Sequence, residues 1–410
     1  MITKKKIIND PIHGFIDVPG GVVYELVSHP YLQRLRDIKQ LGLSYLVYPG
    51  ARHSRFGHAL GAMHLMHQAV ESLRSKGHSI TAEEAEGAAC AILLHDIGHG
   101  PFSHTLESSI VHRISHEKIS FAFMKRLNAQ LDGRLDMAIA IFENEYPKKF
   151  LHQLVSGQLD VDRLDYLCRD SFFSGVAEGM IGLERIIKML EVSNDELVVE
   201  SKGIYSIEKF LISRRLMYWQ VYLHKTVIAA DQLLLQILRR ARLLTQKKIN
   251  LFASPALAFF LKNNITWDDF ENGRALDIFA QLDDSDISCA IKAWCDCSDK
   301  VLRTLCNMLV ARRLFKIEIQ ENPFDSKYII AKKNEAQQEL DLTPEELDYF
   351  VLSDCISNKG YDIDNEKIKI QYRNRDIRDI FEASDMLSVQ AFSGVTKKYF
   401  ICYPKKGVVN

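Results

Sequence analysis

The chain has 410 residues, of which 47% are hydrophobic and 26% are charged, so it can bury a substantial core as an ordinary globular protein does. Its formal net charge of -1 excludes a global electrostatic attraction to nucleic acid or to anionic membranes. The N-terminal stretch MITKKKIIND is followed by no apolar segment, and no run is long and apolar enough for a bilayer, so we expect a cytoplasmic protein without a membrane span.

Three segments of the first two thirds predict helices. Pro30 favours a helix start and Gly42 a stop, with apolar residues at helical spacing between them. Thr81 and Glu84 have the spacing of a capping box, and the helix they open becomes fully apolar toward Gly98. The stretch 206–244 has no Gly or Pro and predicts one long helix.

The remaining patterns predict strands. DELVVESKGIYSI is typical of a short hairpin around Lys202 and Gly203. After about residue 315, FKIEIQ, KYIIAKK, KIKIQYR and KYFICYPKK are short, charged and β-like. We therefore expect a mainly α fold, with a helical domain over residues 1–315 and a smaller mixed α/β region over 316–410.

The cysteines do not indicate a metal site. Eight are scattered through the chain, as expected for reduced thiols of a cytoplasmic protein. Cys295 and Cys297 form a C-x-C without a second pair nearby, which argues against structural zinc.

Histidines gather in one part of the chain. Ten of the fourteen lie between His53 and His116, and LLHDIGHGPFSH places a His-Asp pair at the end of an apolar run. Imidazole and carboxylate together suit a divalent cation. Upstream, Arg55 and His58 share a helix face, and downstream the residues 162, 166 and 170 are spaced i, i+4 and i+8 on another.

These motifs carry a family resemblance. In order, R-F-x-H, H-D-x-G-H-G-P-F-S-H and D-V-D-R-L-D-Y-x-x-R-D resemble the HD-domain metal-dependent phosphohydrolases. Within that family the chain is most similar to the deoxynucleoside triphosphate triphosphohydrolases of the dGTPase and SAM-and-HD-domain type, and NDPIHGFIDV fits this subgroup too. The resemblance covers about residues 6–230, with the HD motifs at about 50–170, and it implies a helical phosphohydrolase core.

The resemblance implies roles for particular residues. Four would hold one divalent ion, Mn, Mg, Fe, Ni or Zn, which acidifies water and polarises phosphate: His58, His95, Asp96 and Asp162. Four would surround the reacting phosphates: His99, His104, Glu107 and His116, with His104 and Glu107 preferred over His116 as proton donor. Phosphate contacts fall on Arg55, Arg163 and Arg214, and sugar contacts fall on Gln40, Leu41, Tyr166, Asp170 and Tyr222.

A regulatory nucleotide is also implied by some members of the family. Lys6, Asn9, Gln33 and Arg36 resemble parts of an activator site that assembles a homo-oligomer, a dimer or a tetramer. Ser28 stands where the vertebrate-type site has the acidic residue that reads guanine, which argues against guanine-specific activation.

The leading interpretation is an enzyme that hydrolyses dNTPs to a deoxynucleoside and inorganic triphosphate, by attack of water on the α-phosphorus. An HD phosphohydrolase acting on another nucleotide phosphoester fits the metal ligands but leaves Arg214 and Tyr222 without a role. A catalytically weak regulator that binds nucleotide or nucleic acid is the third interpretation, although nucleic acid is not expected as a partner.

Overall fold

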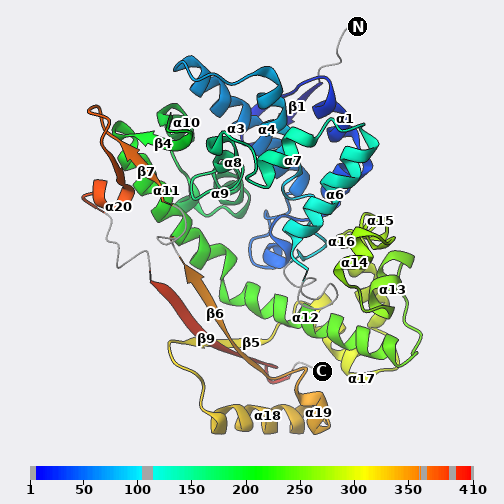
Figure 1. The fold of residues 1–410 in the computed structure, drawn as a ribbon. Helices are drawn as coiled ribbons and strands as arrows, with labels where there is room; N and C mark the ends of the chain where they lie inside the picture. The colour runs from blue at the N-terminus through cyan, green and yellow to red at the C-terminus, as the bar shows by residue number, and fades with distance from the viewer. Residues whose placement is uncertain (1–5, 104–113, 360, 362–366, 387–393, 408–410) are drawn as a thin grey trace.

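The computed structural model describes residues 6–103, 114–359, 361, 367–386 and 394–407, and it shows a mainly α protein with small sheets (Figure 1). Among the described helices, none has both the length and the apolar composition needed to span a bilayer.

The helical body precedes most of the sheet structure in the chain. Its helix α3 packs against α4, α9 and α10, so it lies inside the bundle. The helices, in chain order, are α1 (Val22–Ser28), α2 (Pro30–Gln33), α3 (Arg55–Ser75), α4 (Ala82–Leu94), α6 (His116–Gln130), α7 (Asp136–Phe142), α8 (Lys149–Val155), α9 (Val161–Ser174), α10 (Leu183–Met189), α11 (Ile204–Met217), α12 (Lys225–Gln246), α13 (Pro255–Lys262), α14 (Trp267–Glu271), α15 (Ala275–Phe279), α16 (Asp284–Trp294) and α17 (Lys300–Val310).

Three small sheets surround this body. The strands β1 (Lys6–Asp10) and β2 (Gly14–Val18) form an N-terminal antiparallel hairpin. A four-stranded sheet has the order β3 (Leu190–Ser193), β4 (Glu196–Glu200), β7 (Lys369–Gln371), β8 (Ile377–Asp379), and a three-stranded sheet has the order β5 (Lys316–Gln320), β9 (Val395–Tyr403), β6 (Leu352–Lys359). The C-terminal helices are α18 (Ser326–Leu340), α19 (Pro344–Leu347) and α20 (Ile380–Ala383).

The C-terminal region lies in two places. Its β5-β9-β6 sheet and α18 lie beyond α12, away from α3 and α4, whereas β7, β8 and α20 lie beside α11 (Figure 1). Because β7 pairs in parallel with β4, the sheet that contains them joins strands from both sides of residue 315. The proposed domain division at residue 315 stays a prediction.

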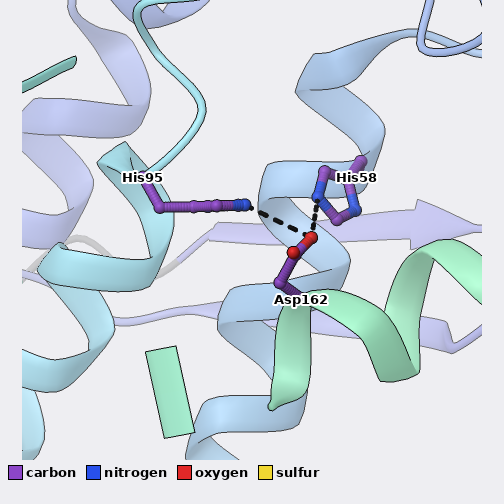
Figure 2. A group of neighbouring side chains, drawn as sticks. All are labelled: His58, His95 and Asp162. Carbon is purple, nitrogen blue, oxygen red and sulfur yellow. Dashed lines mark ion pairs between the residues drawn. The ribbon is translucent and has the colours of Figure 1, made fainter. Parts of the chain in front are cut away.

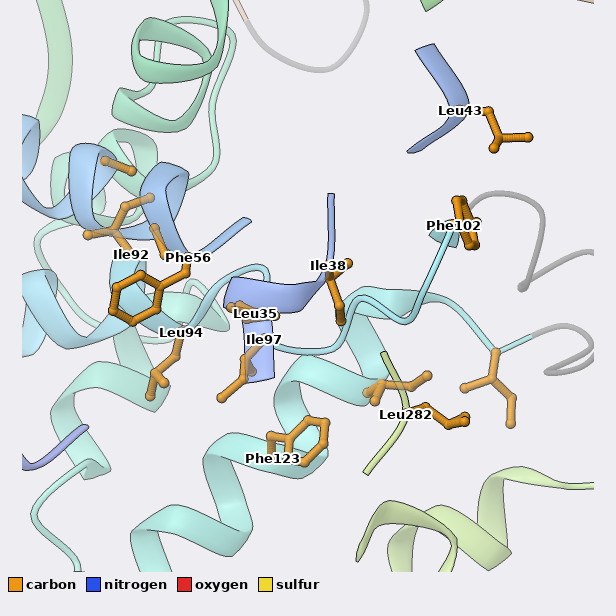
Figure 3. Packing of buried hydrophobic residues seen from close by; sticks show 14 of the residues in the cluster. Leu35, Ile38, Leu43, Phe56, Ile92, Leu94, Ile97, Phe102, Phe123 and Leu282 are labelled. Atoms are coloured by element: carbon orange, nitrogen blue, oxygen red, sulfur yellow. The ribbon is translucent and has the colours of Figure 1, made fainter. Parts of the chain in front are cut away.

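The hydrophobic core encloses the segment that carries the His-Asp pair. Phe56 from α3 and Ile92 and Leu94 from α4 pack together, and Leu35 and Ile97 continue this cluster (Figure 3). All five are at most 3% exposed. Their close packing restricts the movement of the loop after α4.

Two helix starts are confirmed. Pro30 is the first residue of α2, and Thr81 and Glu84 form the expected capping box at α4, with Oγ1 of Thr81 accepting from the Glu84 N–H at 3.1 Å. The expectation of one helix from Pro30 to Gly42 is wrong. After one short 3₁₀ turn, η1 (Arg34–Asp37), Ile38 is extended and its carbonyl accepts from the Arg55 N–H, so the backbone pairs with the start of α3 instead of continuing the helix.

The single long helix over 206–244 is also wrong. The chain forms α11, then a π-helical turn η5 (Tyr218–Tyr222), and restarts as α12. His224 caps the restart, because its Nδ1 accepts from the Thr226 N–H at 3.2 Å. Neither Gly nor Pro causes the break, and the aromatic-rich π turn is of the kind often found at functional sites.

The strand predictions are confirmed in part. β5, β7 and β9 lie in three of the four expected segments, but KYIIAKK belongs to α18, where the carboxylate of Asp325 caps the helix through the Lys327 N–H at 2.8 Å. The hairpin is β3-β4, and its turn lies at Asn194 and Asp195, both with positive φ, instead of at Lys202 and Gly203. Positive φ at two successive residues suits a two-residue hairpin turn.

Gly98 lets the loop after α4 approach α6. A Cβ at Gly98 would collide with the His116 carbonyl and the Ser120 N–H, and the Gly98 N–H donates to Oγ of Ser120 at 2.9 Å. The hydroxyl of Ser120 in turn donates to the His95 carbonyl at 2.7 Å. This contact fixes the His-Asp pair relative to the first turn of α6.

We predict that Gly98→Ala lowers the free energy of unfolding by about 1–3 kcal/mol, because the backbone at both sides must shift. Urea denaturation followed by circular dichroism measures the change. Gly182→Ala is the matched control, since a Cβ there meets no atom within 4 Å. Equal stability of the two variants would contradict the close approach at Gly98.

Candidate metal centre and active site

Three helix ends bring the candidate ligands together. His58 lies in the first turn of α3, which Ser54 caps, and His95 is the C-cap of α4 with Asp96 directly after it. Asp162 lies in the first turn of α9, whose backbone N–H groups favour a carboxylate there. Residues separated by more than one hundred positions therefore meet at one point.

His58, His95 and Asp162 form a compact group (Figure 2). Oδ1 of Asp162 lies 3.0 Å from Nε2 of His58 and 3.4 Å from Nε2 of His95. One ligand atom from each residue lies within 4.8 Å of the other two. Such a set of two imidazoles and a carboxylate can hold a divalent cation.

The imidazole hydrogen bonds fit a metal site. Nδ1 of His58 donates to Oδ2 of Asp165 at 2.8 Å, and Nδ1 of His95 donates to the Ile92 carbonyl at 2.6 Å. Among the residues that the structure describes, neither Nε2 finds a partner with hydrogen-bond geometry, although both atoms are buried. Nitrogens that are buried and without a hydrogen-bond partner, with the opposite ring nitrogen tied down, are typical of metal-ligating histidines.

Asp96 lies beside this group and joins a second one. Its Oδ1 lies 3.4 Å from Nε2 of His95, and its Oδ2 lies 3.9 Å from Nε2 of His58. Oδ2 also accepts from Nη1 of Arg55 at 2.6 Å, so this guanidinium neutralises the carboxylate. The second group of possible ligands is Asp96, His99 and His116. Asp96 thus lies beside both histidines of the first group and belongs to the second.

The charges of the centre depend on one another. Burial opposes the charged form of His58, but the neighbouring carboxylates of Asp162 and Asp165 prevail and raise the pKa of His58 to about 10. Burial likewise disfavours ionised Asp162 and Asp96, yet their histidine neighbours hold the pKa of both carboxyl groups below the usual value. A cation that binds here must therefore displace a proton from an imidazole.

Two histidines predicted to act on phosphate lie next to Asp96. Nε2 of His99 is 3.3 Å from Oδ1 of Asp96, and the His99 ring stacks on His116 with centroids 3.8 Å apart. Burial and the nearby Arg55 lower the pKa of His99 well below its ordinary value, which favours neutral imidazole. His104 and Glu107, predicted as the preferred proton donors, lie outside the described residues.

The predicted sugar side is a second cluster along α9. Both oxygens of Asp170 are engaged: Oδ1 lies 2.7 Å from Nε2 of His53, and Oδ2 accepts from the Tyr222 hydroxyl at 2.6 Å. Tyr166 packs edge-on against Tyr222 at 6.1 Å between ring centroids. Burial, with Asp170 nearby, raises the pKa of Tyr222, so this hydroxyl keeps its proton. His53, for which the sequence predicted no role, lies against Asp170 and stacks on Phe173.

The predicted phosphate-binding arginines have different surroundings. Arg163 pairs with Asp160, the N-cap of α9, and Arg214 lies over the ring of Tyr218 at 5.9 Å. In the described part of the chain, Nη1 of Arg214, Nε of Arg55 and Oε1 of Gln40 are buried without a hydrogen-bond partner. Buried polar atoms without a hydrogen-bond partner cost free energy, which is consistent with a polar ligand.

The other predicted binding residues lie at the edges of this region. The Gln40 N–H donates to the His53 carbonyl at 3.0 Å, which places Gln40 near Asp170, and Leu41 precedes the 3₁₀ turn η2 (Gly42–Leu46). The proposed activator residues lie on β1 (Lys6 and Asn9), at the end of α2 (Gln33) and on η1 (Arg36). Nε of Arg36 donates to Oε1 of Gln33 at 2.7 Å, while Lys6 and Asn9 are both exposed.

The structure contains a buried network of charged side chains that the sequence did not predict. Asp165 and Arg169 on α9 and Asp10 and His13 on the N-terminal hairpin contact one another beneath His58. All four lie within the quoted motifs, and Asp165 and Arg169 have the i, i+4 spacing of a helical ion pair. That spacing was the available signal.

Comparison with known proteins identifies the family. Residues 55–170 match the HD domain and residues 181–254 match the HD associated region. The solved structure of a phosphohydrolase from Bacteroides thetaiotaomicron is 53% identical, covers 98% of this chain and 100% of its own, and superposes with a TM-score of 0.95. The protein YwfO of Bacillus subtilis, of uncharacterized function, is 30% identical over 98% of this chain and 93% of its own length. The chain belongs to the HD-domain phosphohydrolase family.

Members with a named activity are more distant from this phosphohydrolase. The deoxynucleoside triphosphate triphosphohydrolase SAMHD1 homolog of Dictyostelium discoideum is 33% identical over 54% of this chain, and the match spans 46% of that protein. The human SAMHD1 enzyme is 30% identical over 54% of this chain and 42% of its own length. These enzymes therefore match about half of this chain.

We predict that loading the HD centre with Mn²⁺ releases protons at pH 7 and that the affinity for Mn²⁺ falls as pH is lowered. The pKa of about 10 keeps His58 protonated at neutral pH. Because protons compete with Mn²⁺ for the imidazole nitrogen, lowering the pH weakens Mn²⁺ binding. Calorimetric titrations in buffers with different ionisation enthalpies count the protons. Binding without proton release would contradict the protonated resting state of His58.

Proposed function

We propose that this HD phosphohydrolase hydrolyses deoxynucleoside triphosphates to a deoxynucleoside and inorganic triphosphate. The observation that carries the proposal is the arrangement of α9: Asp162, Tyr166 and Asp170 lie on one face, from the cation site to the tyrosine-aspartate cluster, over about 12 Å. That distance suits a nucleotide better than an isolated phosphate. The similarity of the HD core to SAMHD1 enzymes supports the same substrate class.

Binding would depend on charge neutralisation at the phosphates. A cation held by His58, His95, Asp96 and Asp162 would lower the pKa of a water molecule and polarise a phosphoryl oxygen. Arg55, with Nε free, and Arg214, with Nη1 free, are placed to donate to phosphate oxygens. The guanidinium of Arg163 would leave the Asp160 carboxylate and donate to a phosphate oxygen instead.

In the proposed reaction the oxygen of water bonds to the α-phosphorus while the bond from that phosphorus to the 5′ oxygen breaks. The leaving 5′ oxygen then takes a proton. His116, in the first turn of α6 and stacked on His99, is a candidate donor among the described residues, and His104 with Glu107 stays the other candidate pair. Positioning and electrostatic stabilisation would supply most of the rate acceleration.

Selection of the sugar is assigned to the tyrosine-aspartate cluster. Asp170 would accept a hydrogen bond from the 3′-hydroxyl, held in place by His53 and Tyr222. The ring of Tyr222, packed between Tyr166 and Tyr218, would occupy the space that a 2′-hydroxyl needs. A homo-oligomer with an activator nucleotide near Lys6, Asn9, Gln33 and Arg36 and a cytoplasmic location remain predictions.

The proposal is tested by incubating the protein with each dNTP and Mn²⁺ and separating the products by ion-exchange chromatography. We expect deoxynucleoside and triphosphate in equal amounts, and loss of turnover in Asp162→Ala, because the cation loses its carboxylate. Glu71→Ala, on the exposed face of α3, is the control and keeps full activity. Free phosphate as product would favour another phosphoester substrate, and no product would favour a regulator.

Replacement of Tyr222 tests the sugar assignment. Tyr222→Ala is expected to lower the ratio of kcat/KM for a dNTP to kcat/KM for the matching rNTP by about 10-fold to 100-fold, because the ring that blocks the 2′-hydroxyl is removed. The ratio of kcat/KM values for dGTP and GTP measures this effect. Tyr205→Ala, an exposed tyrosine on α11, is the control. An unchanged ratio in Tyr222→Ala would refute the assignment.

A further inference from the structure

The turn of the N-terminal hairpin contacts Asp165, which lies on the Nδ1 side of His58. Oδ1 of Asp10 accepts from the N–H groups of Ile12 and His13 at 2.9 and 3.0 Å, which shapes the turn between β1 and β2. This turn projects the ring of His13 into the protein, where Nε2 lies 2.6 Å from Oδ1 of Asp165. The side chain of His13 is 4% exposed and that of Asp165 is fully buried.

Arg169 binds the same hairpin through ion pairs. Its Nη1 donates to Oδ2 of Asp10 at 2.8 Å, and its Nε donates to Oδ2 of Asp165 at 2.8 Å. The guanidinium thus lies between two carboxylates, with only 1% of the side chain exposed. Because removing one partner would leave a buried charge unpaired, the three groups are strongly held in one arrangement.

The network ends on a predicted metal ligand. Oδ2 of Asp165 accepts from Nδ1 of His58, so it fixes the ring orientation in which Nε2 faces Asp162. Helix α3 closes directly over this network at Gly61, where a Cβ would collide with Asp165 and Arg169. If the hairpin moved, the side chains of Asp165 and Arg169 could therefore not shift toward α3.

We propose that the N-terminal hairpin is a positioning element of the metal centre: Asp10 and His13, acting through Arg169 and Asp165, hold the ring of His58 in the orientation that binds the cation. Docking of the hairpin and occupancy of the cation site are consequently linked, and by reciprocity the cation stabilises the docked hairpin. The inference rests on the cation site of the proposed function, and it assigns to that site a segment that is far from the HD motifs in the sequence.

The first test compares Mn²⁺ affinity of full-length variants by calorimetry. Asp10→Asn removes a charge that is connected to His58 through Arg169 and Asp165. We expect it to weaken Mn²⁺ binding about 10-fold to 100-fold. Asp17→Asn on the exposed side of β2 is the matched control and keeps the wild-type affinity. Titrations are carried out at a temperature at which circular dichroism shows both variants folded.

The second test needs no variant. Amide hydrogen exchange of residues 6–18 in the wild-type protein is measured with and without Mn²⁺, and the linkage requires slower exchange with the cation. This measurement decides the matter if Asp10→Asn does not fold. Unchanged exchange, or equal affinity of the two Asp variants, overturns the inference.

The outcomes separate the two proposals. If Asp162→Ala loses Mn²⁺ binding while Asp10→Asn keeps it, the cation site stands and the role of the hairpin falls. If wild type and Asp162→Ala bind Mn²⁺ equally, the cation site itself is wrong and the hairpin inference falls with it.

Discussion

The hydrogen bond from His58 to Asp165 is the interaction on which the centre depends. An imidazole can bind a cation only when one nitrogen carries no proton and points at the site. Asp165, fully buried and held by Arg169 and His13, provides the acceptor that retains a proton on Nδ1 of His58, so Nε2 is the nitrogen that would release its proton to a cation. The Ile92 carbonyl does the same for His95. Both predicted ligands are thus oriented by groups on the side of the ring opposite to the candidate cation site.

The surroundings of this polar cluster explain why it can persist. Apolar residues of α3 and α4 enclose it, and close packing leaves the charged side chains few alternative arrangements. Burial makes each charge costly alone, yet it also strengthens the attraction between opposite charges. Arg55 with Asp96 and Arg169 with Asp165 show this balance. Of the four predicted ligands, Asp162 has the most exposed side chain, at 27%.

The HD motifs could be predicted from the sequence because their chemistry depends on residue type and order. Two histidines, two aspartates and the capping box of one helix that carries them were identified, and the structure places the four side chains near one another. The hairpin network was not anticipated, since Asp10 and His13 come near Arg169 and Asp165 only when β1 and β2 fold back onto α9. Local periodicity contains no information about such a contact.

The wrong element predictions have similar causes. The helix from Pro30 ends early because Ile38 pairs with the start of α3, and the long helix breaks at Tyr218–Tyr222, where the π turn brings Tyr222 to Asp170. In both places a tertiary contact prevails over a helical propensity that is worth less than about 1 kcal/mol per residue. KYIIAKK becomes helical because of the Asp325 cap and the helix-forming residues after it, which a short window does not weigh.

The amino-acid sequence by itself determined the mainly α class, the family and the set of groups able to hold a cation, because these depend on composition, spacing and residue type. Only the tertiary structure decided which nitrogen of each histidine faces the site, which arginine nitrogens lack a partner and which distant segment contacts the centre. Hydrogen bonds and burial depend on where the backbone places each atom, and that placement results from packing of the whole chain.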